Sequence, residues 1–314
     1  MITQLFAVEH VCKMPGSSQS HLMRCSDRSD YVVKFQNNPQ GSRILANELL
    51  GSLLAERLGL PVPRVALIYV SEEIIRRNPA MVILLRHGKE TCPAGICLGS
   101  LYPRGPNPTR FAALRVLRDS LPVGFSWDVV ENERDFWGML VFDKWTCNTD
   151  RRQCIFVRTN GYRSYRAMMI DQGYCFNGGE WNFPDSPLQG LYRRGNVYEQ
   201  VRGIQEFETW LHALETEIDG TTLRKLGEVI PPRWYQFNRD NLDTLLCQLD
   251  ARRARVRSLL LSTVHACGDF FPRVNRKHRK RKGPLARAQV ACSEKPTEFA
   301  GQPALRSSSE SCGP

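Results

Sequence analysis

Four side chains of this 314-residue sequence have the types and the order that suit phosphoryl transfer. Lys34 lies in a β-branched and aromatic run, and Glu48 lies in the helical pattern that follows it. Asp150 and Asp171 each stand beside an apolar run, 21 residues apart. Phosphoryl transfer needs a cation on the phosphates, an acid that orients the acceptor hydroxyl and a second acid that holds magnesium. The order of the four residues therefore matches a protein-kinase-like site.

The lysine and the glutamate could form a pair inside the protein. Lys34 is flanked by Val33 and Phe35, so it would project from a half-buried strand with its aliphatic stem on apolar neighbours. A buried ammonium is costly unless it is paired, and Glu48 can face inward from the apolar side of the next helix. The alternative is an edge-strand lysine and a solvated helix glutamate.

The two aspartates lie where loops present polar groups. Asp150 follows an apolar helical pattern and precedes an apolar strand, a place where a scaffold positions catalytic side chains. Asp171 follows an apolar run and precedes Gln172-Gly173, which suits a ligand of Mg²⁺. The alternative for Asp150 is an aspartate that bonds its own backbone, and for Asp171 an ordinary turn. The ordered set of four, rather than any one residue, indicates the chemistry.

Strands and helices must alternate in the first third of the chain to place these groups. Helical spacing of apolar residues predicts helices, and short β-branched and aromatic runs predict strands. We expect no internal repeat. The predicted strands cover residues 3–12, 31–35, 62–70, 96–102, 154–158 and 166–170, and the predicted helices cover 42–58, 71–87, 133–146, 207–218, 222–229 and 242–262.

The net charge of +11 is confined to one stretch. Residues 251–287 hold 12 Lys and Arg against one acid, which leaves 31 basic and 31 acidic residues elsewhere. The body of the protein is therefore not a basic nucleic-acid surface, and weak nucleic-acid contact is expected only through residues 273–287. The arginines at 252–257 are expected on the solvated face of the last helix.

The 11 cysteines are scattered without the spacing of a zinc site, and their odd number argues against a disulfide framework. Reduced thiols in a cytoplasmic protein are the simpler interpretation. We find no run of 18 apolar residues and no secretory signal, so no membrane association is expected.

Four stretches resemble the HipA-like kinase family, and in particular its short bacterial members that lack the toxin's N-terminal extension. The likeness covers about residues 5–262. It implies an α+β, bilobal, protein-kinase-like fold that uses ATP and Mg²⁺ and transfers phosphate to a protein Ser or Thr. The implied organisation is an N-terminal nucleotide-binding lobe at 1–102 and a mostly helical catalytic lobe at 103–266. From residue 267 onward Pro, Gly, Ser and charged residues dominate without periodicity, which predicts a basic, mostly disordered tail at 267–314. The matching stretches are 17–63, 95–103, 136–156 and 168–192.

The resemblance also assigns a role to each candidate residue. Lys34 would hold the α- and β-phosphates and Glu48 would pair with it, while Asp150 would be the catalytic aspartate and Asp171 a magnesium ligand. The turn at 16–20 would cover the phosphates, and one of its serines is a candidate autophosphorylation site. The further nucleotide-binding residues that it implies are Gly16, Ser17, Ser18, Gln19 and Ser20 in this turn, and Leu101 and Tyr102 near the adenine.

Two departures from the family pattern leave other functions open. Ile155 stands where kinases have the asparagine that binds a second metal, so Gln153 or Asn148 would have to replace it. The phosphate loop also has a single glycine, Gly16. The alternatives are a nucleotide-binding pseudokinase or interaction module whose basic tail docks on nucleic acid or the ribosome, and a small-molecule kinase of the same fold. The acceptor protein is unknown, and an antitoxin-like partner stays open.

Overall fold

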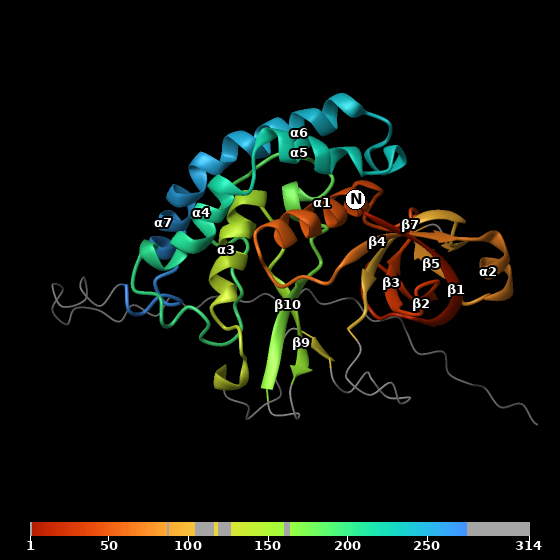
Figure 1. Cartoon of the computed structure of the whole chain (residues 1–314), viewed down its shortest axis with the longest axis horizontal. Helices are drawn as coiled ribbons and strands as arrows, with labels where there is room; N and C mark the ends of the chain where they lie inside the picture. The colour runs from red at the N-terminus through yellow and green to blue at the C-terminus, as the bar shows by residue number, and fades with distance from the viewer. Residues whose placement is uncertain (1, 87, 104–115, 119–126, 160–163, 275–314) are drawn as a thin grey trace, which may run out of the picture. The chain divides into compact units, whose positions relative to one another are not determined.

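The computed structural model describes residues 2–86, 88–103, 116–118, 127–159 and 164–274. Its N-terminal part is a closed five-stranded barrel with the strand order β1-β2-β3-β7-β4 (Figure 1). Neighbouring strands are antiparallel except for β1 and β4. Apolar side chains that alternate along the strands fill the barrel. The barrel strands are β1 (Thr3–Lys13), β2 (His21–Cys25), β3 (Asp30–Lys34), β4 (Val65–Val70) and β7 (Gly95–Leu101).

Helix α1 (Arg43–Arg57) leaves the barrel directly after β3 and is buried along most of its surface. It contacts β4 and also segments of the C-terminal part, so its apolar residues pack on both sides. Gly59 follows its end with φ +70°, a left-handed conformation that glycine adopts without strain. The predicted helix at 42–58 is confirmed.

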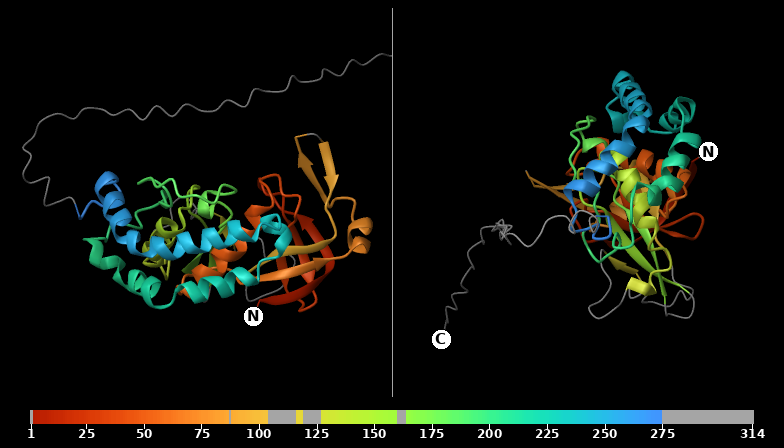
Figure 2. Two further views of the ribbon diagram at one scale, coloured as in Figure 1. Left: turned by 90° about the horizontal axis from the view of Figure 1, so that it is seen from above. Right: turned by 90° about the vertical axis from the view of Figure 1, so that its left-hand side faces the viewer.

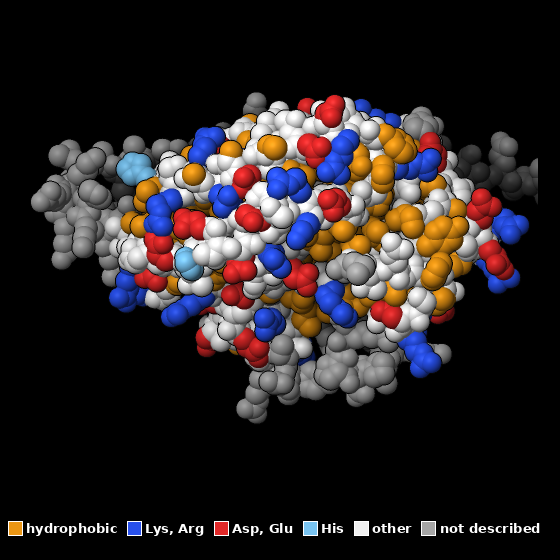
Figure 3. All heavy atoms as spheres, turned by 45° about the horizontal axis from the view of Figure 1, so that its top comes forward, with side chains coloured by type: hydrophobic (Ala, Val, Ile, Leu, Met, Phe, Trp, Pro, Cys, Tyr) orange, Lys and Arg blue, Asp and Glu red, His pale blue; other side chains and the backbone are white. Residues whose placement is uncertain are grey.

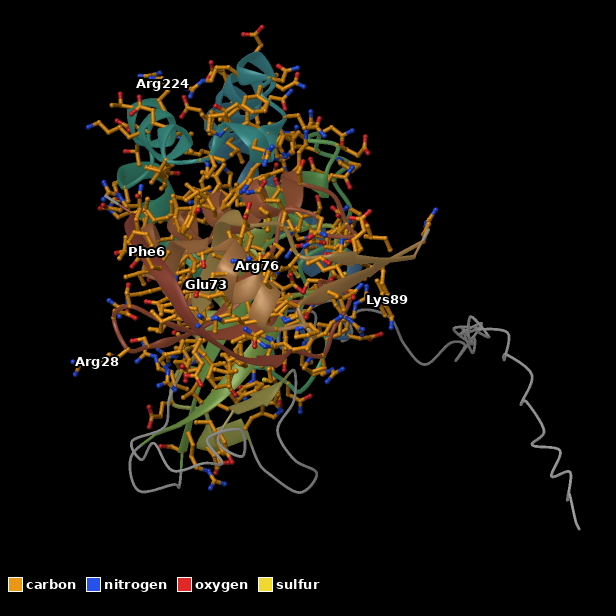
Figure 4. All side chains as sticks on the ribbon, turned by 90° about the vertical axis from the view of Figure 1, so that its right-hand side faces the viewer. Phe6, Arg28, Glu73, Arg76, Lys89 and Arg224 are labelled. Carbon is orange, nitrogen blue, oxygen red and sulfur yellow. The ribbon has the colours of Figure 1, made fainter. Side chains whose placement is uncertain are left out.

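Only the first part of the predicted helix at 71–87 is helical, and the prediction is wrong for the residues after Arg77. Helix α2 (Glu72–Arg77) ends before Pro79, which has no backbone N–H and restricts the residue before it. The β-branched and leucine residues that follow form a hairpin of β5 (Val82–Leu85) and β6 (Gly88–Thr91). This hairpin projects from the barrel, with Lys89 on its outer part (Figures 2 and 4).

The C-terminal part combines a three-stranded antiparallel sheet with helices. Its strand order is β10-β9-β8, and α3 packs against α4, α6 and α7. Over these helices, acidic and basic side chains are interspersed on the face seen in Figure 3. The elements are β8 (Val116–Arg118), α3 (Asp135–Thr146), β9 (Gln153–Thr159), β10 (Ser164–Ile170), α4 (Glu208–Thr216), α5 (Gly220–Glu228), α6 (Arg239–Arg252) and α7 (Val256–Ala266).

The predicted helix at 242–262 is two helices, α6 and α7, joined by a 3₁₀ turn at Arg253–Arg255. Arg252 is buried rather than solvated. Its guanidinium donates to the carbonyl oxygens of Lys144 and Trp145 and to the carboxylate of Asp185. Ordinary helical spacing does not reveal such an arginine, because its partners come from other segments.

The pairing of β9 with β10 gives this hairpin two different faces. Cys154 and Phe156 lie on the core side with Met169, and all three are fully buried. Gln153 is opposite Ile170 in the register, and both lie on the other face together with Ile155. The end of this face therefore carries Gln153 next to the turn that begins at Asp171.

The packed core extends past residue 267, where the tail was expected to begin. Phe271 is fully buried, and its ring lies 5.1 Å from that of Tyr198. The basic cluster and the remainder of the expected tail, from residue 275, lie outside the described residues. None of the described helices is long and apolar enough to cross a membrane.

Candidate active site

Lys34, Glu48 and Asp171 meet at one point although they are far apart in the sequence. The Nζ atom of Lys34 lies 3.0 Å from Oε2 of Glu48 and 3.0 Å from Oδ1 of Asp171. The lysine comes from the last residue of β3, the glutamate from α1, and the aspartate follows the last residue of β10. Lys34 and Glu48 are buried, and the side chain of Asp171 is 25% exposed. The structure thus joins three of the four residues that the sequence singled out.

The charges of this cluster depend on each other. Burial by itself lowers the pKa of the Lys34 ammonium, but the carboxylates of Asp171 and Glu48 outweigh burial and hold that pKa above its ordinary value. Lys34 is therefore a cation at neutral pH. Burial raises the pKa of Glu48, and Lys34 opposes this shift.

Close packing fixes the turn after β10 against α1. Asp171 has φ +61°, so its backbone turns sharply as the strand ends. A Cβ atom on Gly173 would lie 2.7 Å from Cγ2 of Ile44, and one on Gly51 would lie 2.8 Å from Cβ of Gln172. The helix and the turn approach so closely that glycine is needed on both sides.

Asp150 lies in the loop before β9. Its Oδ1 accepts the backbone N–H of Arg151 at 2.8 Å, and its Oδ2 accepts a hydrogen bond from Nε2 of Gln153 at 3.1 Å. Because Gln153 is opposite Ile170, this loop and Asp171 lie at the same end of the β9–β10 hairpin. Asp150 does not itself line the pocket described below.

Asn148 is occupied by structural contacts. It is fully buried, its amide nitrogen donates to Oδ1 of Asp143 at 2.9 Å, and its oxygen accepts the backbone N–H of Asp150 at 3.2 Å. It does not line the pocket. In this position it holds the loop and does not fit the role of a metal ligand.

Arg152 and Asp143 form a fully buried ion pair that the sequence analysis missed. Arg152 also donates to the carbonyl oxygen of Ile170 at 2.9 Å and to Oε1 of Gln172 at 3.1 Å. The pair therefore ties the loop of Asp150 to α3 and to the turn of Asp171. The sequence signal that could have revealed this pair is Asp143, which lies among the apolar residues of α3.

A pocket lies between the barrel and the β9–β10 hairpin, and Lys34 and Asp171 are in its wall. Ile155 and Ile170 line it, so the residue at the expected asparagine position presents an apolar side chain to it. Leu101 and Tyr102 also line it. The other lining residues are Met14, Pro15, Ser18, Ser20, Val32, Glu48, Pro63, Ser100, Pro103 and Gln172.

Only part of the turn at 16–20 lines the pocket. Ser18 and Ser20 line the pocket, whereas Gly16, Ser17 and Gln19 do not. The side-chain amide of Gln19 donates to the carbonyl oxygen of Leu84 at 2.7 Å and accepts its N–H at 2.8 Å. Gln19 thus attaches the turn to the projecting hairpin, and this placement does not favour a phosphate contact.

The donor set is compatible with a divalent cation that also binds phosphates. Among the described residues, no group of three or more His, Cys, Asp and Glu side chains could hold a metal ion. Mg²⁺ in nucleotide sites uses one or two carboxylates and completes its shell with water and phosphate oxygens. The partly exposed carboxylate of Asp171 in the pocket wall fits that pattern. Gln153 has its amide directed to Asp150, on the strand face that borders Asp171.

Residues 9–92 match the family model of the HipA-like kinases. This match confirms the resemblance over the stretch that carries Lys34 and Glu48. No curated protein sequence is significantly similar to the chain.

Solved structures extend the comparison to the whole fold. The crystal structure of CtkA, a proinflammatory kinase of Helicobacter pylori, is similar with a TM-score of 0.52 and 13% identity, over 85% of this chain and 99% of that one. The golgi casein kinase is similar with a TM-score of 0.46 and 11% identity, and the same enzyme with Mn/ADP bound with 0.44 and 10%. Each of these two matches covers 85% of this chain and 74% of the other. At 13% identity the likeness to CtkA shows the fold, which is mixed α/β and protein-kinase-like.

Proposed function

We propose that this protein is an ATP- and Mg²⁺-dependent phosphotransferase of the HipA-like kinase type, which phosphorylates Ser or Thr of a protein. The meeting of Lys34, Glu48 and Asp171 in the pocket wall carries the proposal. Protein kinases need the lysine–glutamate pair and the metal-binding aspartate together. The family match over residues 9–92 supports the same reaction.

In this proposal each residue has one task. Lys34 binds the α- and β-phosphates, held in place by Glu48, and Asp171 holds Mg²⁺, which neutralises charge on the phosphates. Asp150, oriented by Gln153, accepts the proton of the acceptor hydroxyl as its oxygen bonds to the γ-phosphorus. The bond from the γ-phosphorus to the β,γ-bridging oxygen breaks, and ADP leaves. Val32, Ile155 and Ile170 offer an apolar lining for the adenine.

The test is phosphate incorporation from γ-labelled ATP with Mg²⁺, into the protein itself and into a general protein substrate. Asp150→Asn should lower the rate at least about 100-fold, because the acceptor loses its base, and should leave ATP binding intact. Asp269→Asn, an exposed aspartate, is the matched control and should retain the rate. Equal background incorporation by the wild type and Asp150→Asn, with measurable ATP binding, would contradict the proposal.

A second candidate is a module that binds nucleotide without transferring phosphate. The apolar Ile155 in the pocket wall favours it, since protein kinases place a metal-binding asparagine there. Its basic tail would then dock on nucleic acid or the ribosome. Binding of RNA that weakens steeply with added salt, together with no phosphate transfer, would support this candidate.

A further inference from the structure

One buried amide on α1 holds the segment that follows Asp171. Asn47 is fully buried, and its Nδ2 lies 2.8 Å from the carbonyl oxygen of Gly173, 3.1 Å from that of Cys175 and 2.6 Å from that of Gly178. The amide has two N–H groups, so one of them is shared between two of these oxygens. Its Oδ1 accepts the indole N–H of Trp181 at 2.7 Å.

The segment at 173–181 needs hydrogen bonds from outside itself to keep its conformation. Phe176, Asn177 and Trp181 have φ between +53° and +60°, which non-glycine residues adopt only where their surroundings hold them. The carbonyl oxygens in this irregular stretch also need donors once they are buried. Arg43 adds a second tie from α1, since its guanidinium donates to the carbonyl oxygen of Gly179 at 2.8 Å and lies 4.6 Å from the ring centre of Trp181.

The same segment contacts the loop of Asp150. The carbonyl oxygen of Tyr174 accepts the backbone N–H of Thr149 at 3.1 Å, and Thr149 precedes Asp150. Contacts therefore connect Asn47, through residues 173–175, to the loop of Asp150. Glu48 is next to Asn47 on α1, and its carboxylate accepts a hydrogen bond from Lys34 instead.

We propose that Asn47 is a positioning residue that sets Asp150 relative to the Lys34–Asp171 end of the pocket. The inference rests on the proposed function. One turn of α1 holds Lys34 with the side chain of Glu48, and with the side chain of Asn47 it holds the segment that contacts the loop of Asp150. Displacing a reacting group by about 1 Å costs about 100-fold in rate, so loss of this tie lowers the rate of transfer and not the affinity for nucleotide.

The test compares a variant that removes the hydrogen bonds donated by the Asn47 amide with one that removes the hydrogen bond its oxygen accepts. Asn47→Leu is similar in size but donates to none of the three carbonyl oxygens, and we expect kcat to fall about 10- to 100-fold. Trp181→Phe removes the indole N–H together with part of the ring, and it leaves the three contacts of the Asn47 amide nitrogen in place, so kcat should stay within about threefold of the wild type. In both variants the Kd for ATP should change less than about threefold, because Lys34, Glu48 and the apolar lining stay in place.

Two measurements separate positioning from general loss of folding. The kcat is divided by the number of sites that bind ATP stoichiometrically, which removes any unfolded fraction. Hydrogen exchange should become faster at amides 173–181 and 148–152 in Asn47→Leu. If that variant does not fold, Asn47→Ser, whose hydroxyl donates one bond, should show an intermediate loss of kcat.

Three outcomes overturn the inference. The first is an Asn47→Leu protein that keeps the wild-type kcat per ATP-binding site. The second is a loss of ATP affinity in proportion to the loss of kcat. The third is a wild type that binds ATP and transfers no phosphate, which overturns the proposed function as well, whereas the first two leave that function standing.

Discussion

At the scale of single residues, the ammonium of Lys34 is shared between two carboxylates, Glu48 and Asp171. Two of its three N–H donors go to these partners, which leaves one for the phosphate contact that the proposed function assigns to Lys34. Loss of the lysine would leave two partly or fully desolvated carboxylates without their cation, which is costly.

We predict that Lys34→Met lowers the free energy of unfolding by about 2–4 kcal/mol and weakens ATP binding at least tenfold, since Glu48 and Asp171 lose their buried partner and the phosphates lose their cation. Urea unfolding and calorimetric titration with ATP measure the two effects. The double variant Lys34→Met with Glu48→Gln removes one of the stranded charges and should recover part of the stability. Equal stability of the single and double variants would show that the carboxylates do not depend on Lys34.

At the scale of elements, α1 positions the site more than any single loop. It provides Glu48 to the lysine and Asn47 to the segment after Asp171, and its Gly51 allows the turn at Gln172 to approach. This explains why the helix is buried on most sides although it leads from one part of the protein to the other.

The close approach at Gly51 gives a prediction for this helix. Gly51→Ala should lower the free energy of unfolding by about 1–2 kcal/mol and reduce phosphate transfer, because the new Cβ would lie 2.8 Å from Cβ of Gln172. In an open helix the same change would stabilise by about 1 kcal/mol, so the sign distinguishes packing from helix propensity. Thermal unfolding and the transfer assay provide the measurements.

Gly179→Ala is the matched control, since its Cβ would meet nothing within 4 Å. Its stability should stay within about 0.5 kcal/mol of the wild type. A Gly51→Ala protein that is more stable than the wild type would refute the tight packing of α1 on the turn.

At the scale of the whole molecule, a buried histidine links stability to acid pH. His21 is fully buried in the barrel, its Nδ1 lies 3.0 Å from Nε2 of His10, and its ring meets that of Phe35 edge-on. Burial, with smaller contributions from the charges of His10 and Lys13, lowers the pKa of His21 from 6.5 to about 4.

The folded protein therefore keeps His21 neutral where the unfolded chain is protonated. This contribution to stability is complete above pH 6.5 and is lost as the pH falls towards about 4, because the unfolded chain binds the proton first. We predict that His21→Gln, whose side chain does not titrate, flattens this part of the stability profile relative to the wild type. Urea unfolding between pH 4 and 7 measures the difference, with the exposed His212 changed to Gln as control. Parallel profiles for the wild type and His21→Gln would refute the shift.

The residue types and their order in the sequence determined the candidate chemistry and most of the elements that carry it. Lys34, Glu48 and Asp171 could be found because each lies next to an apolar strand or helix whose periodicity is local. The predicted helix at 71–87 is wrong after Arg77, because the apolar residues on both sides of Pro79 fit one helical pattern although Pro79 ends the helix and a strand follows. The short β6 has a polar sequence, and β2 mixes polar and apolar residues over only five positions, so both give little local signal.

Tertiary structure alone decided which polar side chains are available for chemistry. Asn148 has the right residue type for a metal ligand, yet Asp143 and the backbone of Asp150 occupy its amide. Gln19 lies in the expected phosphate turn, yet it pairs with Leu84. Asn47 gave no signal, although it holds a segment about 130 residues away. The physical reason is that burial and hydrogen-bond partners arise from contacts between distant segments, whereas propensity and periodicity report only on neighbours along the chain.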